Sequence, residues 1–303
     1  MLLDISHDSK KVYAALASDT RLEMIRLLSQ KARNIKELSE ILGVSNAIVT
    51  RHIQQLEKAR LIRTEKIPGK SGLQKVSKLI VDNIQIEFPA KIYPDYKSKQ
   101  VELPVGHYTD YFATPTCGLA TENKIIGFVD EPKYFMDPER VQAQIVWFTQ
   151  GFLEYKISNP LNKNEVLKLL EISFEISSEF PYSNNVWPSD ITFYVNNRQI
   201  GTWTCPGNFS DIRGKRTPEW WDDANSQYGL FKTIRISEHG CHFDGELLSK
   251  LTIEDLALQT EDIVTLRISV EEDAKHIGGA TIFGKEFGNH DRDIDFKFYY
   301  IEG

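Results

Sequence analysis

Side chains that can hydrogen-bond the edges of DNA bases are concentrated in one short stretch, Ser45–Gln54. If this stretch is helical, its short polar and basic residues share one face: Asn46, Ala47, Thr50, Arg51 and Gln54. Asparagine pairs with adenine, arginine with guanine, and serine or threonine with either, so such a face can read bases in a major groove. Lysines that could neutralise phosphates without reading sequence follow at positions 66, 70 and 75.

The expected chemistry is therefore DNA recognition. The predicted contacts are Ser45, Asn46, Ala47, Thr50, Arg51, His52, Lys66, Lys70 and Lys75. His52 is ambiguous, because by helical spacing it also borders the buried side. For this histidine we favour a packed or phosphate-bonded role over base reading.

Two helices must position these side chains. The first is predicted over Ile35–Leu42 and ends at Gly43, since glycine tolerates the positive φ of a helix C-terminus. Ser45 then caps a second helix, whose apolar stripe is predicted to be buried: Ile48, Val49, His52, Ile53 and Leu56. Thr20 and Asn34 stand where helix caps are expected. A short glycine-containing turn between two helices is typical of a helix-turn-helix.

A hairpin is predicted directly after the second helix. Residues 61–67 and 73–81 alternate as strands, and residues 68–72, which contain proline and two glycines, form the turn. A hairpin in this place is a wing, and it would carry the three lysines. The alternative is a three-helix bundle with a hairpin that touches no nucleic acid.

The distribution of charge favours the DNA-binding alternative. The 303-residue chain has a net charge of −7, yet residues 1–85 hold 15 basic and 9 acidic residues, a balance of +6. The remainder balances to −13, with 21 basic and 34 acidic residues. A basic N-terminal part on an acidic body suits a module that faces phosphates.

Residues 16–28 (LASDTRLEMIRLL) and 42–62 (LGVSNAIVTRHIQQLEKARLI) resemble the ArsR-type winged helix-turn-helix regulators over about residues 10–82. The resemblance implies that residues 46–52 face DNA and that the protein is a homodimer. Metal sensors of that family carry cysteines on the first helix of the helix-turn-helix. Residues 35–42 contain none, so we expect no metal response and no cofactor.

Beyond residue 81 the pattern changes from helical to alternating, as in residues 172–176, 191–195, 264–270 and 294–298. Asn196-Asn197 is a two-residue hairpin signal. We therefore predict a multidomain α+β protein: a winged helix-turn-helix domain at residues 1–85, and an all-β sandwich or jelly roll at residues 86–303, which includes the alternation of Ile84, Ile86 and Phe88.

Metal-ligating residue types occur together in two places of this β-domain. His239, Cys241, His242 and Asp244 lack a usual zinc spacing, and a polar loop is the simpler interpretation. Asp291, Asp293 and Asp295 lack the glycine and glutamate of a calcium loop, so they are interpreted as the solvent face of a strand. No nucleophile motif is found, and we expect no enzyme.

Four of the five tryptophans fall between residues 185 and 228, among amides and charged groups. Aromatic rings beside planar polar groups suit a ligand pocket, a sugar site in particular; the alternative is that they fill a core. The predicted ligand contacts are Trp187, Trp203, Asn208, Arg213, Trp220, Trp221, Asn225 and Tyr228. We favour a pocket or interface for the Trp220-Trp221 pair and leave Trp203 open.

The function predicted is a DNA-binding transcriptional regulator whose β-domain senses a small molecule. The alternative is a β-domain that is only a structural or partner-binding module; a carbohydrate-active enzyme fused to a regulator is the third hypothesis. The chain has three scattered cysteines, no apolar leader and no run long enough to span a membrane, so we expect a cytoplasmic protein with no membrane partner.

Overall fold

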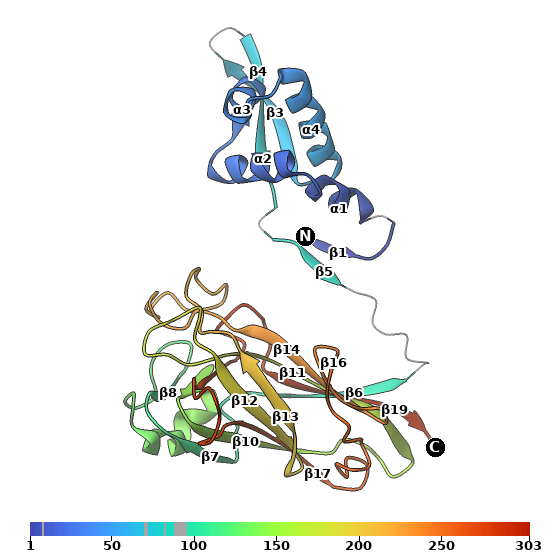
Figure 1. Ribbon diagram of the computed structural model, residues 1–303, viewed down its shortest axis with the longest axis vertical. Helices are drawn as coiled ribbons and strands as arrows, with labels where there is room; N and C mark the ends of the chain where they lie inside the picture. Colours follow the sequence, from blue (N-terminus) through green and yellow to red (C-terminus); the bar gives the residue numbers. More distant parts are fainter. Residues whose placement is uncertain (8, 70–71, 82, 88–95) are drawn as a thin grey trace. The chain divides into compact units, whose positions relative to one another are not determined.

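The computed structural model describes residues 1–7, 9–69, 72–81, 83–87 and 96–303 (Figure 1). The chain divides into two compact units, Met1–Pro94 and Asp95–Gly303. The first contains helices and a small sheet, and the second is built almost entirely of strands. None of the helices in the described ranges is long and apolar enough to cross a membrane.

The first unit is a winged helix-turn-helix, as predicted. Its elements in chain order are β1 (Leu2–Asp4), α1 (Lys10–Leu16), α2 (Asp19–Gln30), β2 (Arg33–Asn34), α3 (Ile35–Leu42), α4 (Asn46–Lys58), β3 (Ile62–Gly69), β4 (Gly72–Leu79) and β5 (Gln85–Glu87). The sheet order β2-β4-β3 makes the wing hairpin with one short added strand.

Local chemistry sets the ends of α3 and α4. The Asn34 side chain accepts from the Glu37 amide at 2.9 Å, and the Glu37 carboxylate accepts from the Asn34 amide at 2.8 Å, which is a capping box. Gly43 has φ +65° at the end of α3, and the Ser45 hydroxyl accepts from the Ile48 amide. These three predicted caps are confirmed. The prediction for Thr20 is wrong, because α2 begins at Asp19, two residues earlier than a Thr20 cap implies, and Ser18 occupies the cap position.

The core of this unit forms where α4 packs on the other helices. Val49, Ile53 and Leu56 are buried, as predicted. Ile48 is 46% exposed, so its assignment to the buried stripe is wrong. It lies about 100° around the helix from Val49 and falls at the edge of the stripe, on the first turn of α4.

The strand β5 corrects another expectation. The alternation at residues 84–88 was assigned to the C-terminal domain, but β5 pairs in parallel with β1, inside the first unit. The register aligns Leu3 with Ile86. Phe88 lies outside the described residues.

The second unit is an antiparallel β-sandwich, as predicted. Its elements are β6 (Lys97–Leu103), β7 (Asp110–Ala113), β8 (Cys117–Ala120), η1 (Pro132–Met136), η2 (Pro138–Gln142), β9 (Ile145–Phe148), β10 (Gly151–Ser158), β11 (Glu165–Ser177), β12 (Ser189–Val195), β13 (Arg198–Cys205), β14 (Leu230–Ser237), β15 (Gly240–Phe243), β16 (Glu246–Ser249), β17 (Ile263–Val270), β18 (Ala280–Phe283) and β19 (Ile294–Glu302).

Within the described ranges, one sheet has the order β13-β12-β17-β10-β7. The other runs β16-β15-β14-β11-β18-β9-β8, with β19 pairing both β11 and β6. Inward side chains of both sheets form one core, in which the rings of Phe174 and Phe193 meet at 5.6 Å. The predicted hairpin is confirmed, since Asn196 and Asn197 join β12 to β13 with φ of 47° and 60°.

Asp293 and Asp295 do not lie on a solvent face, and that prediction is wrong. Asp293 is only 3% exposed and Asp295 only 6%. β19 is an interior strand between β11 and β6, and the segment at Gly284 and Lys285 approaches Asp293. Burial raises the pKa of both carboxyls.

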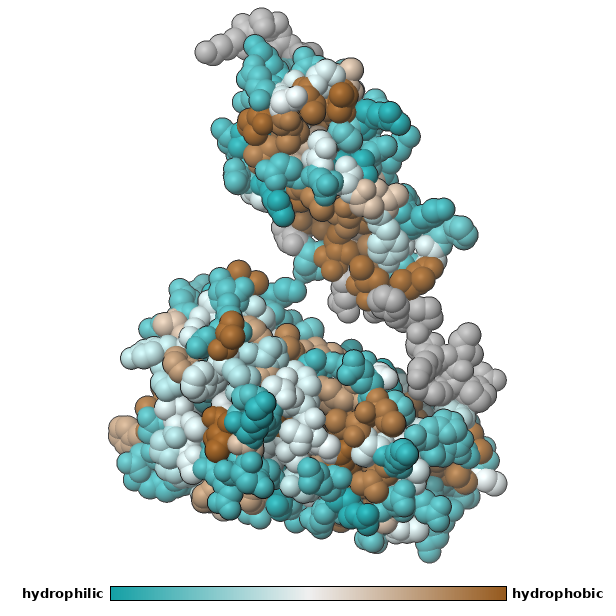
Figure 2. Space-filling model, in the orientation of Figure 1, coloured by the Kyte–Doolittle hydropathy of each residue, from teal (hydrophilic) through white to brown (hydrophobic). Residues whose placement is uncertain are grey.

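Apolar side chains are distributed differently on the two units. Figure 2 shows a large continuous apolar area on the first unit and mostly polar surface with smaller separate apolar areas on the second. The large hydrophobic residues exposed on the first unit include Ile5, Leu22, Ile41, Ile48, Ile80 and Ile86.

Candidate functional site

The face of α4 predicted to read DNA is open to solvent. Ser45, Asn46, Ala47 and Arg51 are exposed, and Thr50 is half-buried. The Thr50 hydroxyl donates to the Asn46 carbonyl at 2.7 Å, so its oxygen remains free to accept from a base. Exposed polar and basic groups at the N-terminal end of this helix have the arrangement that base-edge readout requires.

His52 is held from behind by Arg21. The buried Arg21 guanidinium donates to the carbonyls of Ala14 and Ala15 at 2.7 and 2.6 Å, and to the Gln55 side chain at 2.6 Å. Its Nη1 lies 3.4 Å from His52 Nδ1. Burial, with Arg21 and Arg51 nearby, lowers the pKa of His52. The ring is half-buried with Nδ1 against Arg21, so the geometry favours the packed role.

The wing places two lysines face to face. Lys66 and Lys75 are directly opposite each other in the β3–β4 register, and both are exposed. Like charges opposite each other destabilise a hairpin unless an anion lies between them. Lys78 is neutralised by Glu65 at 2.7 Å. Lys70 lies outside the described residues.

A cavity of about 370 Å³ opens in the second unit. Five segments far apart in the sequence line it, so no single motif encodes it. Its lining residues are Thr116, Ile125, Val129, Asp130, Ile145, Trp147, Glu179, Phe180, Pro181, Tyr182, Trp221, Asn225, Ser226 and Thr281. Of the predicted ligand residues, the structure places Trp221 and Asn225 here.

Trp221 forms part of the cavity wall while being only 6% exposed. Its ring meets Trp147 at 5.7 Å and Phe287 at 5.2 Å, both edge-to-face, and its Nε1 donates to the Ser226 carbonyl at 3.0 Å. It therefore serves both as a core residue and as a surface that a ligand could touch.

The other tryptophans do not form one site with it. Trp220 is 41% exposed, packs edge-to-face on Trp221 and donates from Nε1 to the Glu122 carbonyl at 2.6 Å. Trp187 packs on Phe180 at 4.6 Å between ring centroids and is not among the lining residues. Trp203 on β13 lies against Phe243 and under the Lys232 ammonium, and it does not line the cavity.

The remaining predicted residues brace the loop between β13 and β14. Asn208 is fully buried and donates to the Ser178 carbonyl at 2.7 Å. Arg213 binds Asp223 and the carbonyls of Pro218 and Trp221. The Tyr228 hydroxyl donates to Asp211 at 2.7 Å. These contacts position the loop that carries Trp221 and Asn225.

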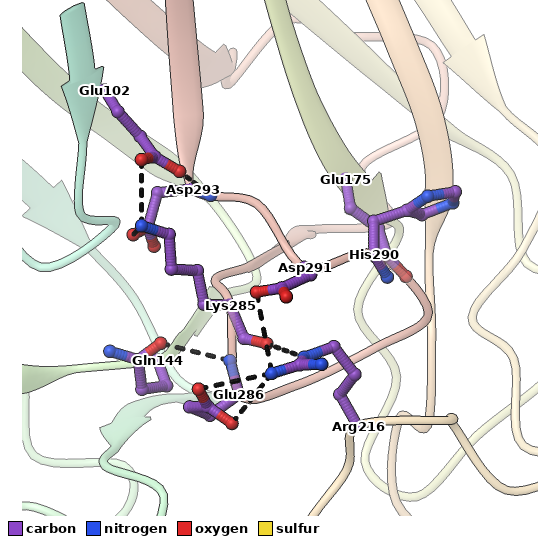
Figure 3. Close-up of polar contacts among 9 residues, drawn as sticks. All are labelled: Glu102, Gln144, Glu175, Arg216, Lys285, Glu286, His290, Asp291 and Asp293. Atoms are coloured by element: carbon purple, nitrogen blue, oxygen red, sulfur yellow. Dashed lines mark hydrogen bonds and ion pairs between the residues drawn. The ribbon is translucent and has the colours of Figure 1, made fainter.

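A second network anchors the same loop from the other side (Figure 3). Arg216 donates to Glu286 at 3.2 Å and lies 3.5 Å from Asp291. The buried Glu175 carboxylate accepts from the backbone amides of Gly229, Asn289 and His290. Burial raises the pKa of Glu175 to about 7. The wall of the cavity is thereby tied to the segment that contains Phe287.

Sequence reasoning missed Glu179, whose carboxyl faces the cavity. It is 7% exposed, with Oε2 2.7 Å from the Thr281 hydroxyl and Oε1 3.2 Å from the Thr116 hydroxyl. Burial, with Asp130 nearby, raises its pKa to about 8. Nothing in the local sequence distinguishes it from the other acidic residues of this domain, because its partners come from distant segments of the chain.

The residues around His239 do not converge on a metal. Cys241 and His242 lie on β15, whereas His239 and Asp244 lie in the turns at its two ends. Cys241 donates to the Leu251 carbonyl, and Asp244 pairs with Lys232. Within the described residues no group of three potential ligands is found. All three cysteines are buried and free.

The helix-turn-helix with its exposed reading face and basic hairpin defines a winged helix-turn-helix DNA-binding domain. Residues 18–64 match the family model for bacterial regulatory proteins of the arsR family, so this domain is of the ArsR type and the chain is a DNA-binding transcriptional regulator. The matched region is a DNA-binding domain rather than an enzyme, and the match does not extend into the β-sandwich. No curated protein matches the chain.

Three solved structures illustrate the likeness of each part. A homodimeric winged helix-turn-helix DNA-binding domain from Mycobacterium bovis is 21% identical and covers 24% of this chain and 63% of its own, with a TM-score of 0.22. An ArsR family transcriptional regulator is 24% identical and covers 25% of this chain and 79% of its own, with a TM-score of 0.23. A CBM51 domain of Clostridium perfringens GH95, in complex with methyl-galactose, is 9% identical and covers 65% of this chain and 99% of its own, with a TM-score of 0.27.

Proposed function

We propose that the chain is a cytoplasmic, homodimeric regulator in which the first unit, Met1–Pro94, binds double-stranded DNA and the second, Asp95–Gly303, binds a small molecule, a sugar. The single observation that carries the sensing half of this proposal is the cavity, whose wall combines Trp147, Trp221 and Tyr182 with a buried carboxyl and an amide. An apolar wall with a few placed polar groups is the usual construction of a small-molecule site, and its volume of about 370 Å³ suits a monosaccharide-sized ligand.

The DNA half is supported by the exposed face of α4 and by the opposed lysines of the wing. Arg51 and Asn46 supply the donor and acceptor groups that distinguish bases, while Lys66 and Lys75 supply charge for phosphates. We assign Ser45, Ala47 and Thr50 to the same contact, and keep Lys70 as a phosphate contact on the strength of its sequence position alone.

The homodimer is supported by the apolar surface of the first unit. Ile5, Leu22, Ile80 and Ile86 are each at least 38% exposed there. Exposed apolar area marks protein interfaces, and a second copy of a DNA-binding domain would give the twofold symmetry of a palindromic operator. Sedimentation of the full chain at micromolar concentration tests this: a monomer at all concentrations would contradict it.

Ligand sensing is tested by thermal unfolding of the full chain with a panel of monosaccharides, followed by DNA binding with any sugar that stabilises it. A ligand that binds the folded state raises the unfolding temperature by mass action. Asn225→Ala in the cavity wall should abolish the shift, whereas Asn164→Ala, an exposed asparagine outside the lining, should retain it.

The result of this pair decides between a sensor and a structural module. A shift lost in Asn225→Ala and kept in Asn164→Ala supports the sensor. If neither variant changes the shift in unfolding temperature, the ligand binds outside the cavity. If no sugar shifts the unfolding temperature, the β-domain is a structural or partner-binding module.

A further inference from the structure

The charge of the cavity wall limits which ligands it can hold. Its carboxyl side chains are Asp130 and Glu179, and no lysine, arginine or histidine is among the lining residues of the described chain. Phosphate and carboxylate groups are bound in proteins by cations or by clustered amide donors. An anionic ligand would instead meet two acids.

The hydrogen bonds around Glu179 fit an uncharged acid. The Thr281 hydroxyl lies 3.2 Å from the Ser178 carbonyl and 2.7 Å from Glu179 Oε2. A hydroxyl has one proton, and a carbonyl can only accept. When Thr281 donates to Ser178, its oxygen is left to accept the proton of Glu179. In this arrangement Glu179 and Thr281 are both paired without burying a charge, and the Ser178 carbonyl also accepts from the Ser177 hydroxyl and the Asn208 side-chain amide.

The other carboxyl oxygen remains an acceptor for a ligand. Oε1 lies 3.2 Å from the Thr116 hydroxyl, which can turn instead to Thr149 at 3.3 Å. A ligand hydroxyl could therefore donate to Oε1 without leaving a protein group unpaired. The rings of Trp147 and Trp221 stand in the same wall and offer apolar surface to the carbon skeleton of the ligand.

We infer that the cavity selects an uncharged, hydroxyl-rich ligand, a free monosaccharide rather than its phosphate ester, and that Glu179 recognises it as an uncharged acid. This inference rests on the proposed sensing function and names the chemical class of its ligand. Glu179 is then a specificity-determining residue, because a phosphate ester would add charge where the wall provides no cation.

The experiment is calorimetric titration of the full chain at pH 7 with matched sets of sugars. Glucose, galactose and mannose are each used as the free sugar, as the 6-phosphate and as the 2-amino sugar. We expect one free sugar to bind at least about tenfold more tightly than its phosphate, since one well-placed polar contact is worth about a factor of ten. The amino sugar should also bind more weakly, because its ammonium would lose solvent beside the uncharged Glu179. The other acid of the wall, Asp130, is exposed, and solvent screens its attraction for a cation.

Two variants test the role of Glu179, with Glu254→Gln, an exposed glutamate outside the cavity lining, as the matched control. Glu179→Gln is uncharged and nearly isosteric, so its affinity for the free sugar should fall by no more than about threefold. Glu179→Leu removes the polar group and should lose about tenfold or more.

Tighter binding of a phosphate or an amino sugar than of the free sugar would overturn the inference while leaving the sensing function standing. An unchanged affinity of Glu179→Leu for the free sugar would also overturn the inference and leave the sensing function standing. If no member of any set binds, both the inference and the sugar-sensing function fail.

Discussion

Trp221 is both a core residue and part of the cavity wall, and its replacement by alanine measures how much it contributes as a core residue. The ring is 6% exposed and packs on Trp147, Trp220 and Phe287, so Trp221→Ala leaves a cavity in a small aromatic cluster. Replacing a buried tryptophan by alanine costs about 3–5 kcal/mol. A domain of this size loses about 2–4 °C of Tm for each kcal/mol, so the sandwich transition should fall by roughly 6–20 °C.

The assay is differential scanning calorimetry of the full chain, which separates the transitions of the two units. Trp220→Ala is the matched control. Its ring is 41% exposed and makes one hydrogen bond at the surface, so the cost should stay near 1 kcal/mol. A decrease in Tm of less than about 2 °C for Trp221→Ala would refute the reasoning, because the ring would then not be buried as the structure has it.

Three further predictions concern DNA binding and pH. Arg51→Ala should cost about 1–3 kcal/mol on the cognate operator and relax base preference at one position, measured by fluorescence anisotropy on an operator series. Lys75→Ala should weaken binding to all sequences alike and reduce the salt slope by about one unit; an unchanged slope would argue against a phosphate contact. Burial raises the pKa of Glu179 to about 8, above the ordinary value of 4.5 that it has in the unfolded chain. The contribution of Glu179 to the free energy of unfolding is therefore fully present below about pH 4.5 and is lost as the pH rises through 8. Glu179→Gln, in which Glu175 and its raised pKa are unchanged, should therefore gain about 3–5 kcal/mol relative to the natural chain between pH 5 and pH 9 in urea unfolding; parallel pH profiles would contradict this.

The DNA-binding fold was predictable because its determinants are local. Asn34, Gly43 and Ser45 act within a few residues of their own positions, so the helix ends could be read from the sequence. Ile48 was misassigned because periodicity locates the centre of an apolar stripe better than its edge. Whether the first turn of a helix is covered depends on its neighbours.

The cavity was only partly predictable because it is assembled from distant segments. The density of tryptophans pointed to the loop that carries Trp221 and Asn225, and the structure places both in the wall. Trp147 is on β9 and Glu179 lies two residues after the end of β11, the strands on either side of β18, and only the strand order brings them together. The burial of Asp295 was missed for the same reason, since alternation does not reveal that a strand is covered on both faces.

The pairing of β1 with β5 has a consequence for how the first unit is completed during folding. Residues 2–4 find their partners at residues 85–87, so this contact closes a loop of more than eighty residues. Loop-closure entropy makes such a contact slow to form and dependent on the elements between its ends being in place. The helices and the wing can therefore form before β1 is placed. A fragment that ends at residue 84 would have no partner for its first strand, whereas one that ends at residue 87 keeps the pair. Hydrogen exchange of the residue 2–4 amides thus reports whether the whole unit has closed, rather than whether its helices have formed.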